Sequence, residues 1–232
     1  MSVERHVFAT KDKLAEALAE AVAENLNTGI DQHGTAVLAV SGGSTPKRFF
    51  EALSNREDID WESVVVTLVD ERWVDETSDR SNAKLVKENL LKGPAAAAAF
   101  VPLFSGGEEP DDAGIARTNA ALADLPGGFD AVILGMGNDG HTASFFPGGD
   151  TLSDALTGEG PAIAIRAPGA GEARVTFTLP RLLATRALYL HIEGDEKAQV
   201  FDKALETGPV EDMPVRAVLS QSAVPVSLFW CP

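Results

Sequence analysis

Short apolar runs alternate with amphipathic segments along most of this chain. Leucine and valine recur every four residues between positions 14 and 26, in a stretch rich in Ala and Glu, which predicts a helix from about Thr10 to just before Gly29. Apolar runs of strand length follow at 35–40, 64–69, 130–135, 187–192 and 225–230, with a further short strand expected within 100–104. Two more segments of helical character lie at 81–91 and 195–205.

These apolar runs lack the alternation with polar residues that marks a half-exposed strand, so they are expected to be covered on both faces. Separated by helices, they predict a mostly parallel, doubly wound sheet with helices on both faces, which is a Rossmann-like α/β fold. The chain has 232 residues and shows neither an internal repeat nor a clear linker. We therefore expect a single domain spanning residues 1–232.

The charge of the chain narrows the classes of ligand. It carries 19 Lys and Arg against 35 Asp and Glu, a formal net charge of -16. This excess opposes nonspecific binding to nucleic acid or to an anionic membrane, so neither partner is expected. Cys231 is the single cysteine, and no run of signal-peptide or membrane-span length is present, which favours a cytoplasmic protein. An anionic ligand would need the few basic residues gathered around it.

Ligands of open α/β sheets bind beyond the carboxyl ends of the strands, so the segments that follow the apolar runs are candidates for a site. These segments read SGGSTP from residue 41, DERWV from residue 70, GMGNDGHTASFFPG from residue 135 and EGDEKA from residue 193.

The first of these segments has the composition of a phosphate-binding turn. Gly42 and Gly43 permit a tight turn, and Ser44 or Thr45 can cap the helix that follows. Pro46 suits the first position of that helix, whose free N–H groups would face a phosphate. A plain strand-to-helix turn without a ligand is an equally open interpretation. A serine nucleophile elbow is disfavoured, because Pro46 stands where G-x-S-x-G requires its last glycine.

Three basic residues are candidates for binding an anion. Arg72 ends the DER triplet, Arg174 opens RVTFTLP, and Lys197 follows the apolar run at 187–192. Taken singly, Arg72 is more typical of a surface ion pair with Asp70 or Glu71, and the other two of solvated side chains. Their positions near strand ends favour a shared role in binding phosphate, for which a guanidinium has suitable fork geometry.

Gly135, Gly137 and Gly140 show the G-x-G-x-x-G spacing of a dinucleotide-binding turn. That motif should open the first βαβ unit, whereas here it follows a late strand and is soon interrupted by FFPGG, so a nicotinamide cofactor is not expected. His141 lies in the same loop beside Asp139, a carboxylate that can orient an imidazole for proton transfer.

The remaining histidines, His6, His33 and His191, are interpreted as structural. No metal-ligand spacing is present in the chain, so no metal is expected.

Together these segments resemble the 6-phosphogluconolactonase family over nearly the whole chain. The resemblance rests on SGGSTP, on DERWV followed by SNAKLVKENLL, on GMGNDGHTASFFPG, and on RVTFTLPRLLATRALYLHIEGDEKA. It implies hydrolysis of 6-phospho-D-glucono-1,5-lactone to 6-phosphogluconate without cofactor or metal, by a chain expected to be a monomer.

By this resemblance His141 is the general base that activates water, and Asp139 orients it. The phosphate is expected at Gly42, Gly43, Ser44 and Thr45 together with Arg72, Arg174 and Lys197. Backbone N–H groups between residues 137 and 140 are the expected donors to the oxyanion.

Two alternative functions stay open. Glucosamine-6-phosphate deaminases resemble this chain in fold and in a D-G-H motif, but that family has DEY where this chain has Asp70-Glu71-Arg72, and a glutamate where it has Phe146. A non-catalytic sugar-phosphate sensor is the other alternative. Against it, the chain has no room for a separate DNA-binding domain, its charge repels DNA, and a sensor has little need of His141.

Overall fold

The computed structural model describes residues 3–125 and 127–232 and contains a seven-stranded, wholly parallel sheet in the order β1-β10-β9-β6-β2-β3-β5. Its strands are β1 (Val3–Val7), β2 (Ala36–Val40), β3 (Val64–Leu68), β5 (Ala99–Val101), β6 (Ala131–Leu134), β9 (Leu188–Glu193) and β10 (Val226–Cys231). The helices are α1 (Lys11–His33), α2 (Lys47–Ser54), α3 (Asn82–Asn89), α4 (Asp112–Leu122), α5 (Leu152–Thr157), α6 (Leu179–Leu183), α7 (Asp195–Leu205) and α8 (Val215–Ser220). Short 3-10 helices occupy Trp61–Ser63 and Gly93–Ala97.

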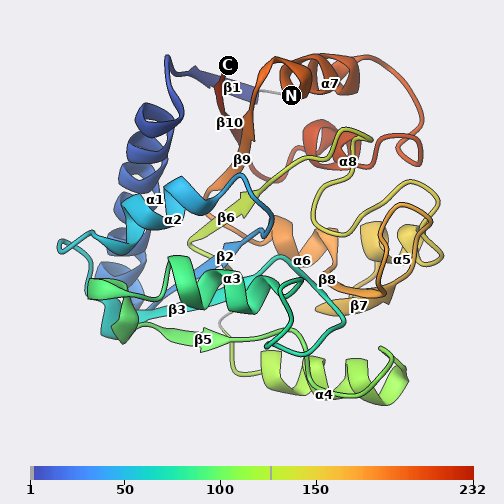
Figure 1. The fold of residues 1–232 in the computed structure, drawn as a ribbon, viewed down its shortest axis with the longest axis horizontal. Coiled ribbons are helices and arrows are strands. Elements are labelled where there is room, and N and C mark those ends of the chain that lie inside the picture. Colours follow the sequence, from blue (N-terminus) through green and yellow to red (C-terminus); the bar gives the residue numbers. More distant parts are fainter. Residues whose placement is uncertain (1–2, 126) are drawn as a thin grey trace.

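The predicted α/β fold is confirmed. Every residue of β2 and β6 is buried, as expected for strands covered on both faces. Figure 1 shows α1 and α2 along one side of the sheet, with α6 and α8 on the other. The predicted strands and the helices at 81–91 and 195–205 appear within a few residues of their expected bounds. Within the described residues, no helix is long and apolar enough to cross a membrane.

The first helix is longer than predicted. It begins after Thr10, whose side chain accepts the Lys13 N–H as the N-cap, but it runs to His33 and ends at Gly34 with φ 76°. Gly29 therefore does not end the helix. It lets the helix approach β6, because a Cβ at Gly29 would lie 2.3 Å from Oδ1 of Asp130.

The start of α2 also differs from the prediction. Pro46 is the N-cap rather than the first helical residue, and no side chain caps the helix, so the expected capping role of Ser44 or Thr45 is wrong. The carbonyl of Pro46 accepts the N–H of Phe50 at 2.8 Å. At the other end of this turn, the N–H and the hydroxyl of Ser41 both donate to the carbonyl of Ile133, at 3.0 and 2.7 Å.

A second, smaller sheet was not expected from the sequence. It is antiparallel, in the order β4-β8-β7, and consists of β4 (Asp70–Arg72), β7 (Ala162–Ile165) and β8 (Arg174–Phe177). Because β4 follows β3 after a single residue, this sheet is anchored at the carboxyl end of the parallel sheet. Its pairing sets Arg72 opposite Arg174.

Candidate active site

The carboxyl ends of β2, β3, β6 and β9 meet at a cleft of about 240 Å³. Of the predicted site residues, those that line it are Gly42, Gly43, Ser44, Thr45, Arg72, His141, Arg174 and Lys197. Asp139 is not part of the lining but is hydrogen-bonded to His141. The structure thus brings the predicted residues to one place, although they come from five separate parts of the chain.

His141 is fixed by contacts within its own loop. Its Nδ1 lies 2.5 Å from Oδ1 of Asp139, and its backbone N–H donates to the same oxygen at 3.1 Å. The Gly137 N–H donates to the His141 carbonyl at 2.8 Å, which closes the loop behind the imidazole. Burial by itself raises the pKa of Asp139, but the hydrogen bond and charge of His141 outweigh it and lower that pKa. An ionised Asp139 holds a proton on Nδ1, so Nε2 of the neutral ring is left as a proton acceptor.

The loop leaves no space for a side chain at residue 137. A Cβ on Gly137 would lie 2.1 Å from Nδ1 of His141 and 2.6 Å from Oδ1 of Asp139. On another side the imidazole stacks on Phe146, with ring centroids 4.1 Å apart. The glycine is therefore required by the close approach of the imidazole, and Phe146 and Asp139 together set the ring's orientation.

The expected oxyanion donors need a correction. The Gly137 N–H is used by the His141 carbonyl, and the Gly140 N–H donates to the Gly137 carbonyl at 3.1 Å. Both groups close the loop and face inward, so neither is available to a ligand. An N–H group that forms a hydrogen bond within the loop cannot also donate to an oxyanion, and the N–H groups of Gly137 and Gly140 both form such bonds.

Arg72 and Arg174 form the cationic part of the cleft. Arg72 Nη1 donates to the carbonyl of Arg80, and Arg174 Nη2 donates to the carbonyl of Ala170 at 2.7 Å. The Nε atoms of both side chains are buried and have no hydrogen-bond partner among the described residues. Burial lowers the pKa of Arg174, Asp70 opposes this shift and Arg72 adds to it. Two adjacent guanidinium groups that repel each other are a suitable site for an anion.

The alternative interpretation of Arg72, a surface ion pair with Asp70 or Glu71, is not found among the described residues. Asp70 instead lies 3.7 Å from Arg174 Nη1 and accepts the Ser144 hydroxyl at 2.5 Å. Ser144 is aimed by a tight turn in which Ala143 has φ 47°, the single non-glycine residue at positive φ in the described part of the chain. Such backbone strain is found at functional sites, where surrounding contacts hold it.

Glu71 is fully buried and supports the loop that carries Arg72. Its carboxylate accepts the N–H groups of Arg72 at 2.7 Å, Asn82 at 2.8 Å and Ala83 at 2.7 Å. Burial raises the pKa of Glu71, and these three backbone hydrogen bonds oppose the shift. Because two of the N–H groups belong to the first turn of α3, Glu71 joins that helix to β4.

Lys197 comes from the first turns of α7. Its Nζ donates to the carbonyl of Met136 at 2.5 Å, beside the loop of His141. Burial lowers the pKa of Lys197, and the charges of Asp139 and Glu196 oppose this shift. Lys197 therefore adds a positive charge to the cleft beside the His141 loop.

Several lining residues were not identified from the sequence. Asn82 packs so closely on the 42–45 turn that a Cβ at Gly42 would lie 1.9 Å from its Oδ1, an atom that is buried without a hydrogen-bond partner in the described chain. His191, interpreted as structural, is 3% exposed yet lines the cleft together with Glu193. The SN pair after DERWV was a signal for Asn82. A histidine inside an apolar run carries no such signal, because strand residues alternate in direction and the sequence does not say which face meets a cleft.

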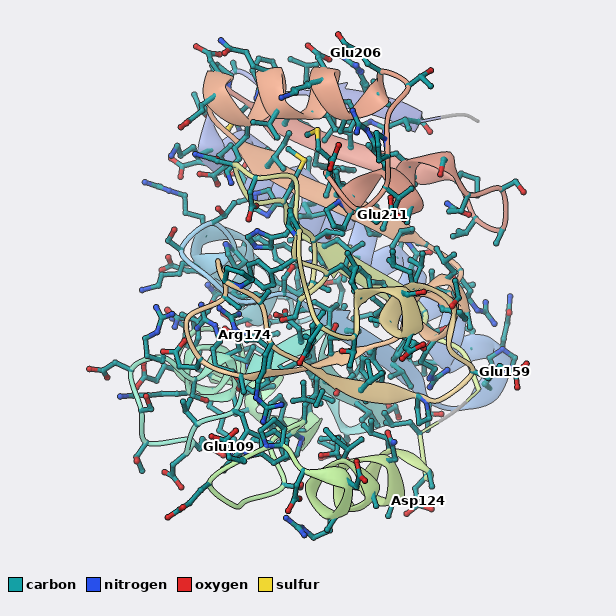
Figure 2. The ribbon with its side chains drawn as sticks, turned by 90° about the vertical axis from the view of Figure 1, so that its right-hand side faces the viewer. Glu109, Asp124, Glu159, Arg174, Glu206 and Glu211 are labelled. Atoms are coloured by element: carbon teal, nitrogen blue, oxygen red, sulfur yellow. The ribbon has the colours of Figure 1, made fainter. Side chains whose placement is uncertain are left out.

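Figure 2 shows Arg174 between the α7 end of the molecule, where Glu206 lies, and the α4 end, where Asp124 lies. Among the described residues, no group of three His, Cys, Asp or Glu side chains gathers closely enough to hold a metal ion.

The chain is similar to known proteins over almost its whole length. A family model described as glucosamine-6-phosphate isomerases/6-phosphogluconolactonase matches residues 9–230. A 6-phosphogluconolactonase of Rhizobium meliloti is 50% identical over 234 residues, covering 100% of both chains. A 6-phosphogluconolactonase of Mesorhizobium japonicum is 49% identical and covers 98% of this chain and 94% of its own.

The chain is also similar to solved structures. The crystal structure of a 6-phosphogluconolactonase from Shewanella baltica superposes with a TM-score of 0.97 at 41% identity, covering 100% of this chain and 98% of the other. A monomeric glucosamine-6-phosphate deaminase has a TM-score of 0.78 at 18% identity and covers 97% of both chains, a likeness that concerns the fold alone.

Proposed function

Because the chain belongs to the glucosamine-6-phosphate isomerase/6-phosphogluconolactonase family, we propose that it hydrolyses 6-phospho-D-glucono-1,5-lactone to 6-phospho-D-gluconate. One observation carries the chemistry of this proposal. His141, with Nδ1 2.5 Å from Asp139, faces the same cleft as Arg72, Arg174 and Lys197. A general base and an anion site therefore stand together, as a phosphorylated lactone requires.

The proposed reaction needs one base and one water. Nε2 of His141 accepts a proton from water, whose oxygen attacks C1 of the lactone. The tetrahedral intermediate then breaks the bond between C1 and the ring oxygen, and the imidazolium returns its proton to that oxygen. A lactone is an activated ester, so this route requires no covalent bond to the enzyme. Asp139 stabilises the imidazolium formed in the first step.

The phosphate is proposed to bind where the cations meet the 42–45 turn. Arg72 and Arg174 offer guanidinium groups with buried, unpaired Nε atoms, and Lys197 adds a third positive charge. Gly42, Gly43, Ser44 and Thr45 border the same space with backbone and hydroxyl groups. Phosphate binding then fixes the position of the lactone so that C1 lies next to the attacking water. This lowers the activation barrier of hydrolysis, although the cations do not touch C1.

The deaminase alternative is less well supported at one residue. Phe146 occupies the place of the glutamate expected in deaminases, and its ring stacks on His141. A phenyl ring can exchange no proton with a sugar, so aldose–ketose isomerisation would lack an acid/base group there.

The organisation of the chain is part of the proposal. We propose one domain, supported by the pairing of β1 with β10, which ties both ends of the chain into one sheet. We also propose a monomer, because the large apolar side chains exposed among the described residues are Val7 and Leu205 alone. A cytoplasmic location is proposed from the single, buried and unpaired Cys231.

The test is hydrolysis of freshly made 6-phosphogluconolactone, corrected for spontaneous opening, by the wild type and by His141→Asn. Loss of a general base should lower kcat by roughly 10²- to 10⁴-fold. Binding of 6-phosphogluconate, measured by calorimetry, should stay within a few-fold of the wild type, since the cations are intact. Ammonium release from glucosamine 6-phosphate is measured in parallel. Ammonium release without lactone hydrolysis would favour the deaminase, and ligand binding without either reaction would favour the sensor.

A further inference from the structure

One carboxylate in the wall of the cleft has no part in the mechanism above. Glu193 is the last residue of β9, and its side chain is 11% exposed. Its Oε2 lies 3.0 Å from Nζ of Lys11, and its Oε1 lies 3.4 Å from Nε2 of His191. Burial by itself raises the pKa of Glu193, but His191 and Lys11 outweigh it and lower that pKa. Glu193 is therefore ionised at neutral pH.

A negative charge is unexpected in a site for a phosphate ester. Asp70, the other carboxylate that lines the cleft, is engaged by Arg174 and by the Ser144 hydroxyl. Glu193 has no such contact with the cations of the cleft, and its charge disfavours a dianionic ligand nearby. An ionised carboxylate accepts hydrogen bonds and donates none, so the ligand groups that suit it are hydroxyls.

We propose that Glu193 is a specificity-determining residue that accepts a hydrogen bond from a ring hydroxyl of the sugar lactone. The inference rests on the proposed lactonase function, whose substrate carries hydroxyls at C2, C3 and C4. Lys11 and His191 each engage a different oxygen of Glu193, and an ionised carboxylate has about four lone-pair directions, so acceptor capacity remains for the ligand.

Two elements of the fold hold this carboxylate in place. Lys11 begins α1, whereas His191 lies within β9 and packs edge-to-face on Phe49 of α2, with ring centroids 6.3 Å apart. His191 Nε2 is buried and has no hydrogen-bond partner in the described chain, but it lies within ion-pair distance of Oε1 of Glu193, at 3.4 Å. Lys11 and His191 are therefore positioning residues, which act through Glu193.

A purely structural role predicts something different. If the ion pair between Lys11 and Glu193 only joined α1 to β9, its loss would affect every substrate equally. A hydroxyl acceptor, in contrast, matters only for a substrate that carries the hydroxyl it contacts. The experiment therefore compares substrates as well as variants.

Wild type, Glu193→Gln and Glu193→Ala are assayed with 6-phosphogluconolactone and with its 2-deoxy, 3-deoxy and 4-deoxy counterparts. Glu109→Gln is the matched control, because Glu109 also forms an ion pair, 2.7 Å from Arg166, but lies outside the cleft. For the wild type, removing the contacted hydroxyl should lower kcat/KM by about tenfold or more. In Glu193→Ala the parent substrate should lose a similar factor, while the deoxy substrate should be almost unaffected. Glu193→Gln keeps one neutral acceptor oxygen and should lose less.

Lys11→Gln separates positioning from contact. It should reduce the discrimination between parent and deoxy substrates less than Glu193→Ala does, since Glu193 itself remains as the acceptor. Thermal unfolding of each variant checks the fold, and the near-isosteric glutamine variant serves if Glu193→Ala does not fold.

An equal loss on all four substrates would overturn this inference and leave the lactonase function standing. A wild type that opens none of the lactones would overturn both. Discrimination that vanishes only in the Glu193 variants, with Glu109→Gln like the wild type, is the expected result.

Discussion

The loop of His141 and the pair of Arg72 and Arg174 differ in how they are built. The imidazole is held by Gly137, Asp139, its own backbone and the stacked ring of Phe146, all within ten consecutive residues. The two guanidinium groups come from strands far apart in the sequence and meet only because β4 pairs with β8. Each is then anchored by a carbonyl group, that of Arg80 for Arg72 and that of Ala170 for Arg174.

This difference teaches that the proposed base and the proposed phosphate site can be perturbed separately. Changes inside the loop should act on the chemical step, because they move the group that handles the proton. Changes to the cations should act on substrate capture, because their contact exists before and during the reaction.

Apart from replacement of His141 itself, the largest effect is expected from Gly137→Ala. The added Cβ would lie 2.1 Å from Nδ1 of His141, so the imidazole must move away from its place. A displacement of this order can lower the rate by about 10²-fold. Lactone hydrolysis by the variant should show this loss in kcat, with little change in KM. Gly160→Ala is the control, since a Cβ there meets nothing within 4 Å. A Gly137→Ala enzyme with wild-type kcat would contradict the proposed role of the loop.

A smaller effect, on substrate binding instead of on the chemical step, is expected from Arg72→Ala. Loss of hydrogen bonds from a charged donor costs about 1.5–3 kcal/mol, or roughly ten- to a hundredfold in binding. Steady-state kinetics should show this as a higher KM, with kcat changed less. Arg166→Ala removes an exposed arginine outside the cleft and should behave like the wild type. If Arg72→Ala lowered kcat at an unchanged KM, the residue would belong to the chemical step instead.

The smallest effect is expected on stability, at the surface ion pair of Glu172 with Arg80, which lies next to Arg72. Glu172, just before β8, binds Arg80 through two hydrogen bonds of 2.8 and 3.1 Å, and Arg80 supplies the carbonyl that holds Arg72. The hydrogen bond with Arg80 lowers the pKa of Glu172 from 4.5 to about 2. A carboxylate with a lowered folded-state pKa stabilises the fold above its unfolded pKa, and loses that contribution as pH falls through the folded one.

Wild type should therefore be more stable than Glu172→Gln above pH 4.5, by less than about 1 kcal/mol for so exposed a pair. The difference should shrink as the pH falls from 4.5 toward 2. Denaturant unfolding of both proteins over this range measures it. A difference that stayed constant with pH would show that Glu172 acts through packing and not through its charge.

Local signals in the sequence determined much of this protein. Apolar runs predicted six of the seven strands of the parallel sheet, all except β1, and Thr10 marked the start of the first helix. Parallel strands place their carboxyl ends at one edge, so the segments after the runs could be assigned to one site before the structure was known. His141, Asp139 and Gly137 were identifiable because their contacts span only five residues. Their roles in catalysis stay predictions.

Only the tertiary structure decided the rest. The sequence could not tell that Arg72 faces Arg174 while Asp70 pairs across to Arg174, because β4 and β8 are short and their register depends on the whole second sheet. Nor could it place His191 in the cleft or pair Glu193 with Lys11, since an apolar run does not say which face of a buried strand meets a ligand or a distant helix. Short-range contacts follow from neighbours along the chain, whereas these depend on how distant strands pair, and pairing is set by the packing of the complete fold.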